Sequence, residues 1–263
     1  MQTQLRQAVV VAFGRTPYCK ARKGSFAQLH PVEYGAQTLL GVLARVPQLR
    51  PEDIGDVIMG CAMPFGVQGG NMARLIVQRA GLPDCVTAQT VNRYCSSGLQ
   101  TIATAANAIR CGEEDVVIAG GVESMSLVPM LVGAEDADPW LAEHRPEVYT
   151  TMGITAENVA RQWGISRADM DAMAVESHRR AAQAQAGGCF DGQIIPITVP
   201  GPDGGEVVVC RDEGIRPGTT AETLAGLKPC FLENGSVTAA TSSQMTDGAG
   251  FVVLMSEEKA AEL

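Results

Sequence analysis

Short runs of β-branched residues alternate with longer stretches of helical periodicity along the first half of the chain. Short apolar runs bounded by Gly, Pro or Asn are typical of buried strands, whereas longer periodic stretches are typical of helices. This alternation predicts an α/β fold. Strands are expected at residues 7–13, 54–59, 86–91 and 115–119, the last ending in a Gly-Gly pair, and helices at 31–45, 71–80 and 96–110.

The middle of the chain has a different pattern, with Pro- and Gly-rich connections such as VPGPDGGE around two helices. These helices are expected at Thr155–Trp163 and Arg167–Ala186. Ser166 followed by Asp169 is an imperfect capping-box signal at the start of the second helix. The pattern indicates a long insertion between two strands of the core.

The core pattern resumes with expected strands at residues 236–241 and 250–255 and a last helix from Ser256. Glu257 and Glu258 lie in the first turn of that helix, where the helix dipole favours negative charge. We therefore predict a core domain of residues 1–123 and 236–263 and an inserted loop domain of residues 124–235.

The expected helix at Ser96–Arg110, SSGLQTIATAANAIR, has no polar face. Small and apolar residues surround it, and charge appears only at its end. A helix of this kind is buried on all sides, and one sheet covers only one side. No internal repeat supplies a second sheet. The pattern therefore predicts that a further layer, from a second sheet or another subunit, covers this helix.

Composition limits the classes of function. The net charge of −9 argues against general nucleic-acid binding, which needs a basic surface. No apolar run is long enough to cross a bilayer, and we expect neither a secretory signal nor a membrane partner. Arg15, Lys20, Arg22 and Lys23 form a local basic run, which we interpret as a solvated loop.

The chain contains eight cysteines, none in a C-x-x-C pair and none at metal-ligand spacing from a histidine. We therefore expect no metal site. A chain of this length builds its own core, so disulfides are not needed for stability. We expect reduced thiols and a cytoplasmic location. Any single cysteine could be a small buried apolar residue.

One cysteine lies at a junction suited to chemistry. In TVNRYCSSGLQ, a buried strand turns sharply at Cys95 into a helix. Unpaired N–H groups and the dipole at a helix start favour a thiolate, the nucleophile that thioester exchange requires. Gly98 leaves room for a substrate in the first turn. From these residues alone, a catalytic cysteine and a structural cysteine are equally supported.

The segment VNRYCSSGLQTIATAANAI resembles the thiolase signature around the acyl-accepting cysteine. Further blocks resemble successive thiolase motifs in order, namely GRTPYCKARKGSF, DVVIAGGVESMSLVP, MGITAENVA, DEGIRPGTTAETLAGLKPCF and GSVTAATSSQMTDGAG. The resemblance covers practically the whole chain and is closest to degradative 3-ketoacyl-CoA thiolases. It implies a thiolase-like fold, in which this chain forms one βαβ half of an α-β-α-β-α sandwich.

The resemblance also implies roles for individual residues. Cys95 matches the nucleophile that takes the acyl group from a 3-ketoacyl-CoA. Coenzyme A is then a substrate, and no cofactor is implied. Residues that match the family's CoA and acyl contacts are Met152 for the pantetheine and acyl pocket, Arg216 and Thr223 for the nucleotide, and Ala239 and Ser243 for the pantetheine arm.

The sequence departs from the family pattern in places. Thr151 stands where many biosynthetic thiolases have His, which leaves the acyl preference open. A thiolase's second half supplies a His, an Asn and a second Cys, and these 263 residues contain none of those blocks. His30, His144 and His178 match no catalytic block, and we interpret His178 as solvated on a polar helix face.

Three functions remain open from the sequence. The first is an acyltransferase that cleaves a 3-ketoacyl-CoA with CoA to acetyl-CoA and a shortened acyl-CoA, or catalyses the reverse condensation. The second is a catalytically silent half that binds CoA or a partner. The third, against which the Gly-Gly-x-Glu-Ser-Met turn counts, is a ketoacyl synthase-type condensing enzyme. The family resemblance further implies a homodimer or tetramer.

Overall fold

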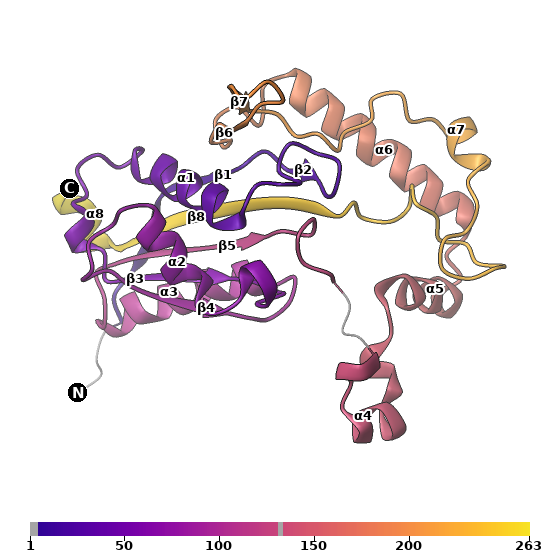
Figure 1. The fold of residues 1–263 in the computed structure, drawn as a ribbon, viewed down its shortest axis with the longest axis horizontal. Coiled ribbons are helices and arrows are strands. Elements are labelled where there is room, and N and C mark those ends of the chain that lie inside the picture. Colours follow the sequence, from indigo (N-terminus) through magenta and orange to yellow (C-terminus); the bar gives the residue numbers. More distant parts are fainter. Residues whose placement is uncertain (1–4, 131–133) are drawn as a thin grey trace. The chain divides into compact units, whose positions relative to one another are not determined.

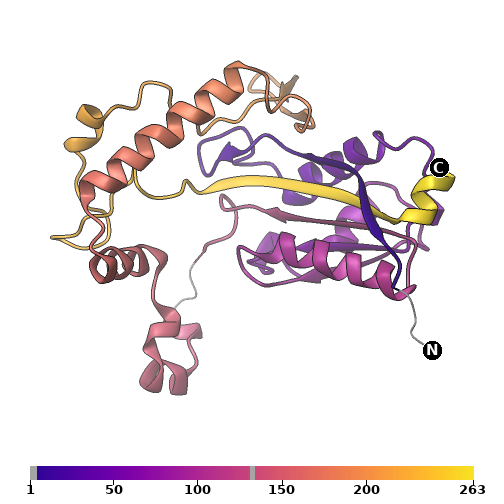
Figure 2. The ribbon, with the colours of Figure 1, turned by 180° about the vertical axis from the view of Figure 1, so that it is seen from behind.

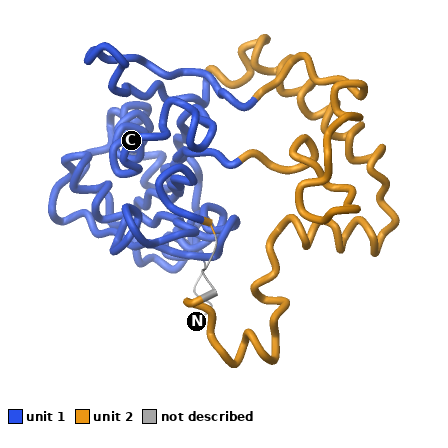
Figure 3. The backbone as a smooth tube through the Cα atoms, turned by 45° about the vertical axis from the view of Figure 1, so that its right-hand side comes forward, with its two compact units in different colours: residues 1–129, 192–214, 245–263 blue, residues 130–191, 215–244 orange. Residues whose placement is uncertain are grey.

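A computed structural model describes residues 5–130 and 134–263 of the chain. The chain divides into two compact units (Figure 3). Unit 1 comprises residues 1–129, 192–214 and 245–263, and unit 2 comprises residues 130–191 and 215–244. The sequence assigned residues 192–214 to the insertion, whereas the structure packs them with the core. No described helix is both long and apolar enough to span a bilayer.

Unit 1 is built on one mixed sheet (Figure 1). Its strand order is β1-β8-β5-β3-β4, with β2 paired to β8 beside this path. The strands are β1 (Ala8–Arg15), β2 (Cys19–Lys20), β3 (Asp56–Gly60), β4 (Thr87–Val91), β5 (Val116–Glu123) and β8 (Thr246–Ser256). β3 is parallel to β4 and β5, whereas β8 is antiparallel to β1 and β5.

Helices cover both faces of the sheet, as Figures 1 and 2 show from opposite sides. Side chains alternate across β5, so that Val116 and Ile118 face one core cluster and Val117 and Ala119 face another. The first cluster contains the buried faces of α1 and α2, and the second contains that of α3. The helices are α1 (Pro31–Leu43), α2 (Met72–Arg79), α3 (Ser97–Cys111) and the C-terminal α8 (Glu257–Glu262).

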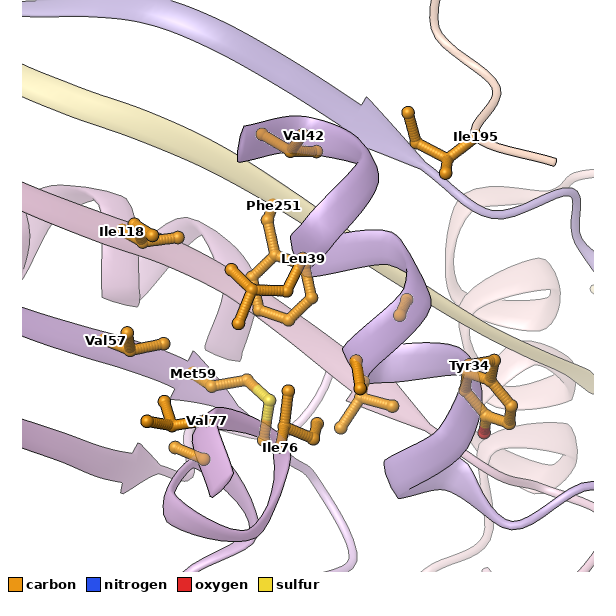
Figure 4. Packing of buried hydrophobic residues seen from close by; sticks show 14 of the residues in the cluster. Tyr34, Leu39, Val42, Val57, Met59, Ile76, Val77, Ile118, Ile195 and Phe251 are labelled. Atoms are coloured by element: carbon orange, nitrogen blue, oxygen red, sulfur yellow. The ribbon is translucent and has the colours of Figure 1, made fainter. Parts of the chain in front are cut away.

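The larger core cluster lies under α1 (Figure 4). Pro31 occupies the first turn of this helix, and the His30 side chain accepts a hydrogen bond from the backbone N–H of Val32. Such a cap satisfies one of the N–H groups left open at a helix start. Leu39 is fully buried and packs in the same cluster as Ile118 and Phe251, so α1 is held to the centre of the sheet.

Strand β5 continues through the Gly120-Gly121 pair, where the sequence predicted its end. Gly120 pairs with Phe251 and Gly121 with Gly250. A Cβ atom on Gly120 would lie 2.2 Å from the carbonyl oxygen of Gly250. The glycines therefore allow close approach of neighbouring strands, and the strand carries Glu123 out at its carboxyl end.

Residues 192–214 join unit 1 through apolar contacts and paired polar groups. The backbone N–H of Ile195 donates to the Arg15 carbonyl over 2.7 Å. Ile195, Ile197 and Val199 are buried in the larger core cluster. The segment contains a hairpin of β6 (Ile197–Pro200) and β7 (Glu206–Val209), where the sequence pattern predicts only connections.

The interpretation of Arg15 as a solvated residue is wrong, because its guanidinium is paired with Asp212. The Arg15 guanidinium donates to both oxygens of Asp212 over 2.7 and 2.9 Å, and only 14% of its side chain is exposed. Asp212 also accepts from the Tyr18 N–H, and the guanidinium lies over the Tyr18 ring. Such a two-pronged pair fixes orientation, because both N–H groups must meet both oxygens.

Unit 2 is mainly helical. It contains α4 (Pro139–His144), α5 (Met152–Trp163), α6 (Arg167–Ala186) and α7 (Ala221–Ala225). Short 3-10 turns are η3 (Ala134–Asp136) and η4 (Pro146–Tyr149) here, and η1 (Pro51–Asp53) and η2 (Gly66–Gln68) in unit 1. Ser166 and Asp169 form a complete capping box at α6, which confirms that signal.

The predicted core strand at residues 236–241 is wrong. These residues lie in unit 2 and form a loop, with only Thr238 in an isolated bridge, to Pro229. The Thr241 hydroxyl accepts from the Thr238 N–H over 2.9 Å, and the Ser242 hydroxyl donates to the Thr238 carbonyl over 2.8 Å. Hydroxyl side chains that bond nearby backbone in this way compete with strand pairing.

Candidate active site

Cys95 lies in the turn between β4, which ends at Val91, and α3, which begins at Ser97. Tyr94, immediately before it, has a φ angle of 46°, a left-handed conformation that side-chain-bearing residues rarely adopt. Strained residues of this kind persist only where their surroundings hold them. The chain therefore turns abruptly at Cys95, as the sequence predicted.

Side chains within the turn hold this conformation. The Asn92 side-chain oxygen accepts from the Tyr94 N–H over 2.8 Å. The Ser97 hydroxyl accepts from the Arg93 N–H over 2.8 Å and donates to the Tyr94 carbonyl over 2.5 Å. These bonds tie the strained residue to the first residue of α3, so the position of Cys95 is set on both sides.

Strand β3 supports the turn from the sheet. The Asn92 amide donates to the Ala62 carbonyl over 3.1 Å, and the Ala62 N–H donates to Glu123 over 2.7 Å. Gln68, which is fully buried, donates to the same carboxylate over 2.7 Å. A chain of hydrogen bonds therefore connects the ends of β3 and β5 to the turn that carries Cys95.

The start of α3 lies directly against Gly60, the last residue of β3. A Cβ atom at Gly60 would lie 2.6 Å from the Ser97 Cβ and 2.9 Å from the Gly98 nitrogen. The Thr101 hydroxyl, in the next turn, donates to the Gly120 carbonyl on β5 over 3.0 Å. A residue without a side chain is thus required where the helix start meets the sheet.

Cys95 is exposed. Its sulfur makes no hydrogen bond to any residue within the described parts of the chain. Two large side chains close to it in the sequence are also exposed, Tyr94 at 69% and Leu99 at 72%. A thiol that is open to solvent at a helix start is accessible to a thioester, unlike a cysteine packed in a core.

Helix α3 buries one face against the sheet and leaves its other face open in this structure. Its buried residues are Ser97, Thr101, Ala105 and Ile109, which follow one another at one helical turn. Leu99 and Ala103, on another side of the helix, are exposed. The apolar residues that the sequence pattern noted all round this helix therefore have no second layer against them within the described residues.

The two buried cysteines differ from Cys95 in their surroundings. Burial, followed by the nearby Glu123 carboxylate, raises the pKa of Cys61 to about 12. Burial also raises the pKa of Cys19 far above its ordinary value, with Glu213 and Asp247 adding to the shift. Both thiols therefore stay protonated at neutral pH and are poor nucleophiles.

This difference predicts selective alkylation. At a pH near 8, iodoacetamide should modify Cys95 in the folded protein and leave Cys61 unmodified, because Cys61 becomes a thiolate only as the pH approaches about 12. Peptide mass mapping measures both sites. Unfolding in urea is the control and should expose Cys61 to the reagent. Equal labelling of the two cysteines in the folded protein would contradict the prediction.

The residues predicted to contact CoA all lie in unit 2, whereas Cys95 lies in unit 1. Met152 is the first residue of α5 and is 67% exposed. Ala239 and Ser243 are exposed in the loop that follows the isolated bridge of Thr238. These positions are open to a ligand, and their assignment to CoA remains a prediction from the family resemblance.

Arg216 and Thr223 are close together in the chain, and Arg216 comes shortly before α7. Thr223 is in α7, and its hydroxyl accepts from the Thr220 N–H over 3.0 Å and donates to the Thr220 carbonyl over 2.9 Å. That hydroxyl therefore caps α7 in this structure. The Arg216 side chain is exposed, and its backbone N–H donates to His178 Nδ1 over 3.2 Å.

Sequence reasoning missed the functions of His178 and Glu157 in unit 2. His178, which was interpreted as solvated, instead holds the backbone of Arg216 from α6. Glu157 is only 5% exposed although it is charged. The local helical pattern does not reveal that Glu157 is buried, because its partners lie about 80 residues away along the chain. Across residues 5–130 and 134–263, no cluster of acidic, His or Cys side chains is suited to a metal ion.

Comparison with known families supports a specific relationship. Residues 8–258 match the family model described as "Thiolase, N-terminal domain". A 3-ketoacyl-CoA thiolase of Bacillus subtilis (strain 168) is 49% identical over 267 residues, covering 98% of this chain and 68% of that protein. A peroxisomal 3-ketoacyl-CoA thiolase of Arabidopsis thaliana is 39% identical, covering 97% of this chain and 56% of that protein.

A solved structure of an acetyl-CoA acetyltransferase has a similar fold. The crystal structure of the Bacillus anthracis acetyl-CoA acetyltransferase matches with a TM-score of 0.88 and 38% sequence identity. The match covers 98% of this chain and 68% of that structure. The predicted thiolase-like α/β fold is therefore confirmed, and the chain corresponds to about two thirds of the length of that enzyme.

Proposed function

Because this chain belongs to the thiolase family, we propose that it supplies the acyl-accepting cysteine and part of the CoA site of a 3-ketoacyl-CoA thiolase. Relatives with 40–49% identity are named 3-ketoacyl-CoA thiolase or acetyl-CoA acyltransferase. The observation that carries the proposal is an exposed Cys95 held in a strained turn at the start of α3.

The proposed reaction has two steps. The Cys95 thiolate attacks the 3-keto carbon of the substrate, and the bond between carbons 2 and 3 breaks. The electron pair remains on carbon 2, which takes a proton and leaves as acetyl-CoA. The thiolate of a second CoA then attacks the acyl-Cys95 thioester, which releases a shortened acyl-CoA and restores the cysteine. Thioester exchange of this kind requires no change of oxidation state, and CoA is the only coenzyme proposed.

The surroundings of Cys95 suit the first step. The turn bonds of Asn92 and Ser97 fix the sulfur before substrate arrives, which lowers the entropic cost of reaching the reacting geometry. The proton transfers need a base, and the family resemblance implies the His and second Cys blocks for this role.

For the CoA side, we propose contacts from the exposed positions in unit 2. Arg216 can meet a phosphate or stack on adenine, because a guanidinium is planar and always charged. The hydroxyl of Ser243 can bond a pantetheine amide. Met152 and Ala239 would offer apolar surface to the pantetheine arm and the acyl chain.

We further propose operation in the degradative direction, in a reducing compartment such as the cytoplasm, and as a homodimer or tetramer. All eight cysteines are unpaired, which supports a reducing location. Exposed apolar residues at the start of α3, Tyr94 and Leu99, support association with further protein surface.

The central test is detection of the intermediate. The protein, combined with the remaining third of a thiolase, is mixed with acetoacetyl-CoA, quenched in acid and digested, and the peptides are mapped by mass. We expect one acetyl group on the peptide that contains Cys95. Acetylation of a different cysteine with none on Cys95 would refute the assignment.

A second assay separates the enzyme from a silent CoA-binding module. Thiolysis of acetoacetyl-CoA is measured with the chain alone and with the remaining third of a thiolase added. We expect turnover only in the second case. CoA binding by calorimetry without turnover in either case would favour the non-catalytic function.

A further inference from the structure

The buried carboxylate of Glu157, on α5, receives hydrogen bonds from a loop that is distant in the sequence and contains Ser236 and Val237. Oε1 accepts from the N–H of Val237 over 2.8 Å, and the carboxylate accepts from the N–H of Ser236 over 2.9 Å. The Ser236 hydroxyl donates to Oε2 over 2.9 Å. Three donors thus converge on one side chain, and all of these residues belong to unit 2.

The shape of the loop matches this carboxylate. A Cβ atom on Gly235 would lie 2.2 Å from Glu157 Oε1, so only glycine lets the carboxylate reach the two N–H groups that follow. Burial disfavours the charged form of Glu157, but the bonds from Ser236 and Val237 offset this effect and lower its pKa below the ordinary value. The group is therefore a carboxylate at neutral pH, and charge-assisted hydrogen bonds of this type are strong.

The loop continues directly from Ser236 and Val237, which bond Glu157, to the proposed CoA contacts. The Cys230 N–H donates to the Val237 carbonyl over 3.0 Å, which fixes the other side of Val237. The Thr238–Thr241 turn follows, closed by the Thr241 N–H on the Thr238 carbonyl over 3.2 Å. This turn carries Ala239, and Ser243 comes two residues after it.

The same helix carries a third proposed contact. Met152 begins α5, and Glu157 lies in the second turn of that helix. The hydrogen bonds of Glu157 therefore link the helix that presents Met152 to the loop that presents Ala239 and Ser243. Without the carboxylate, the N–H groups of Ser236 and Val237 would lose partners in a mostly buried place, and the loop would lose its fixed position.

We infer that Glu157 is a positioning residue, which sets the loop of residues 236–243 against the start of α5 so that both present one surface to the pantetheine arm of CoA. This inference rests on the proposed function. Glu157 directs its carboxylate to Ser236 and Val237 in its own unit, so its loss should act on substrate binding and leave the chemical step largely unchanged.

The test is the Glu157→Gln variant, in which an amide of the same shape replaces the carboxylate. Assayed together with the remaining third of a thiolase, the variant should show a KM for CoA about ten-fold higher than the parent and a kcat within about two-fold of it. Glu176→Gln is the matched control, because Glu176 lies on α6 of the same unit and, within the part of the chain that the structure describes, bonds the exposed Arg179 and Arg180. It should leave both constants unchanged.

A milder variant covers the case in which Glu157→Gln does not fold. Ser236→Ala removes one of the three donors and should raise KM about three-fold in a variant that still unfolds cooperatively above the assay temperature. An unchanged KM in a folded variant, or a fall in kcat at constant KM, would overturn the inference.

Failure of the inference can be told apart from failure of the proposed function. If the parent protein forms no acyl-Cys95, the proposed function fails. If acyl-Cys95 forms normally and KM does not respond to Glu157, only the positioning role fails. The alkylation rate of Cys95, measured in every variant, shows whether unit 1 remains native.

Discussion

Replacement of Cys95 with alanine is expected to lower the rate of thiolysis by about 10³-fold or more, because no acyl-enzyme can form without the sulfur. The stability of the protein should change little, since Cys95 is exposed and its sulfur has no hydrogen bond within the described residues. Steady-state assays with acetoacetyl-CoA, in the presence of the remaining third of a thiolase, measure the rate, and urea unfolding measures the stability.

Cys85→Ala is the control for this prediction. Cys85 is another exposed cysteine, located shortly before β4, and it matches no catalytic block. Its replacement should leave activity near the parent value. Cys95→Ser provides a further comparison, because a hydroxyl of similar size ionises far less readily than a thiol and should restore little activity. Full activity in Cys95→Ala would rule out Cys95 as the nucleophile.

Gly60→Ala is expected to damage both stability and reactivity. The added methyl would lie 2.6 Å from the Ser97 Cβ and 2.7 Å from the Ser97 carbonyl carbon, so the start of α3 must move away from β3. Backbone displacement of this kind costs about 1–3 kcal/mol in a well-packed place. The turn at Tyr94–Ser97 would move with the helix, which would displace Cys95 from its reacting position.

Two measurements check this second prediction. Urea unfolding should show the loss of stability, and the rate of Cys95 acetylation by acetoacetyl-CoA should fall. Gly192→Ala is the control, since a Cβ atom there would meet no atom within 4 Å. A Gly60→Ala protein with parental stability and acetylation would show that the helix start does not need this close contact.

The elements of unit 1 follow from local pattern. The apolar runs at the predicted strands become β1, β3, β4 and β5, each within a few residues of its expected bounds. Helices α1, α2 and α3 begin and end within a few residues of their expected bounds, with Pro31 in the first turn of α1, Asn71 at the start of α2 and Gly112 at the end of α3. These signals act over a few residues, through capping bonds and side-chain periodicity, and a sequence displays them directly.

Long-range partners account for the errors. Arg15 looked like part of a basic loop because its partner, Asp212, is 197 residues away along the chain. Residues 236–241 looked like a strand because β-branched residues and threonines are common in strands. Glu157 and the local hydroxyl bonds hold them as a loop instead. Neither outcome can be read from the neighbouring residues.

The error in the predicted boundary of the insertion also comes from partners that are distant in the sequence. Pro- and Gly-rich composition placed all of residues 124–235 in one inserted domain. Ile195 and Ile197 instead bury themselves against α1 and β1, because apolar side chains stabilise whichever surface removes them from water. Composition shows that a segment is a connection, but it does not show which core its few apolar residues join.

By itself, the sequence determined the order of strands and helices as far as β5, the family and the position of Cys95 at a strand-to-helix turn, because each depends on residues close together in the chain. Only the tertiary structure decided how the turn is supported, which segment completes unit 1 and where Glu157 directs its carboxylate. Those features depend on hydrogen bonds and packing between residues far apart in sequence, whose free energy exists only once the chain has folded.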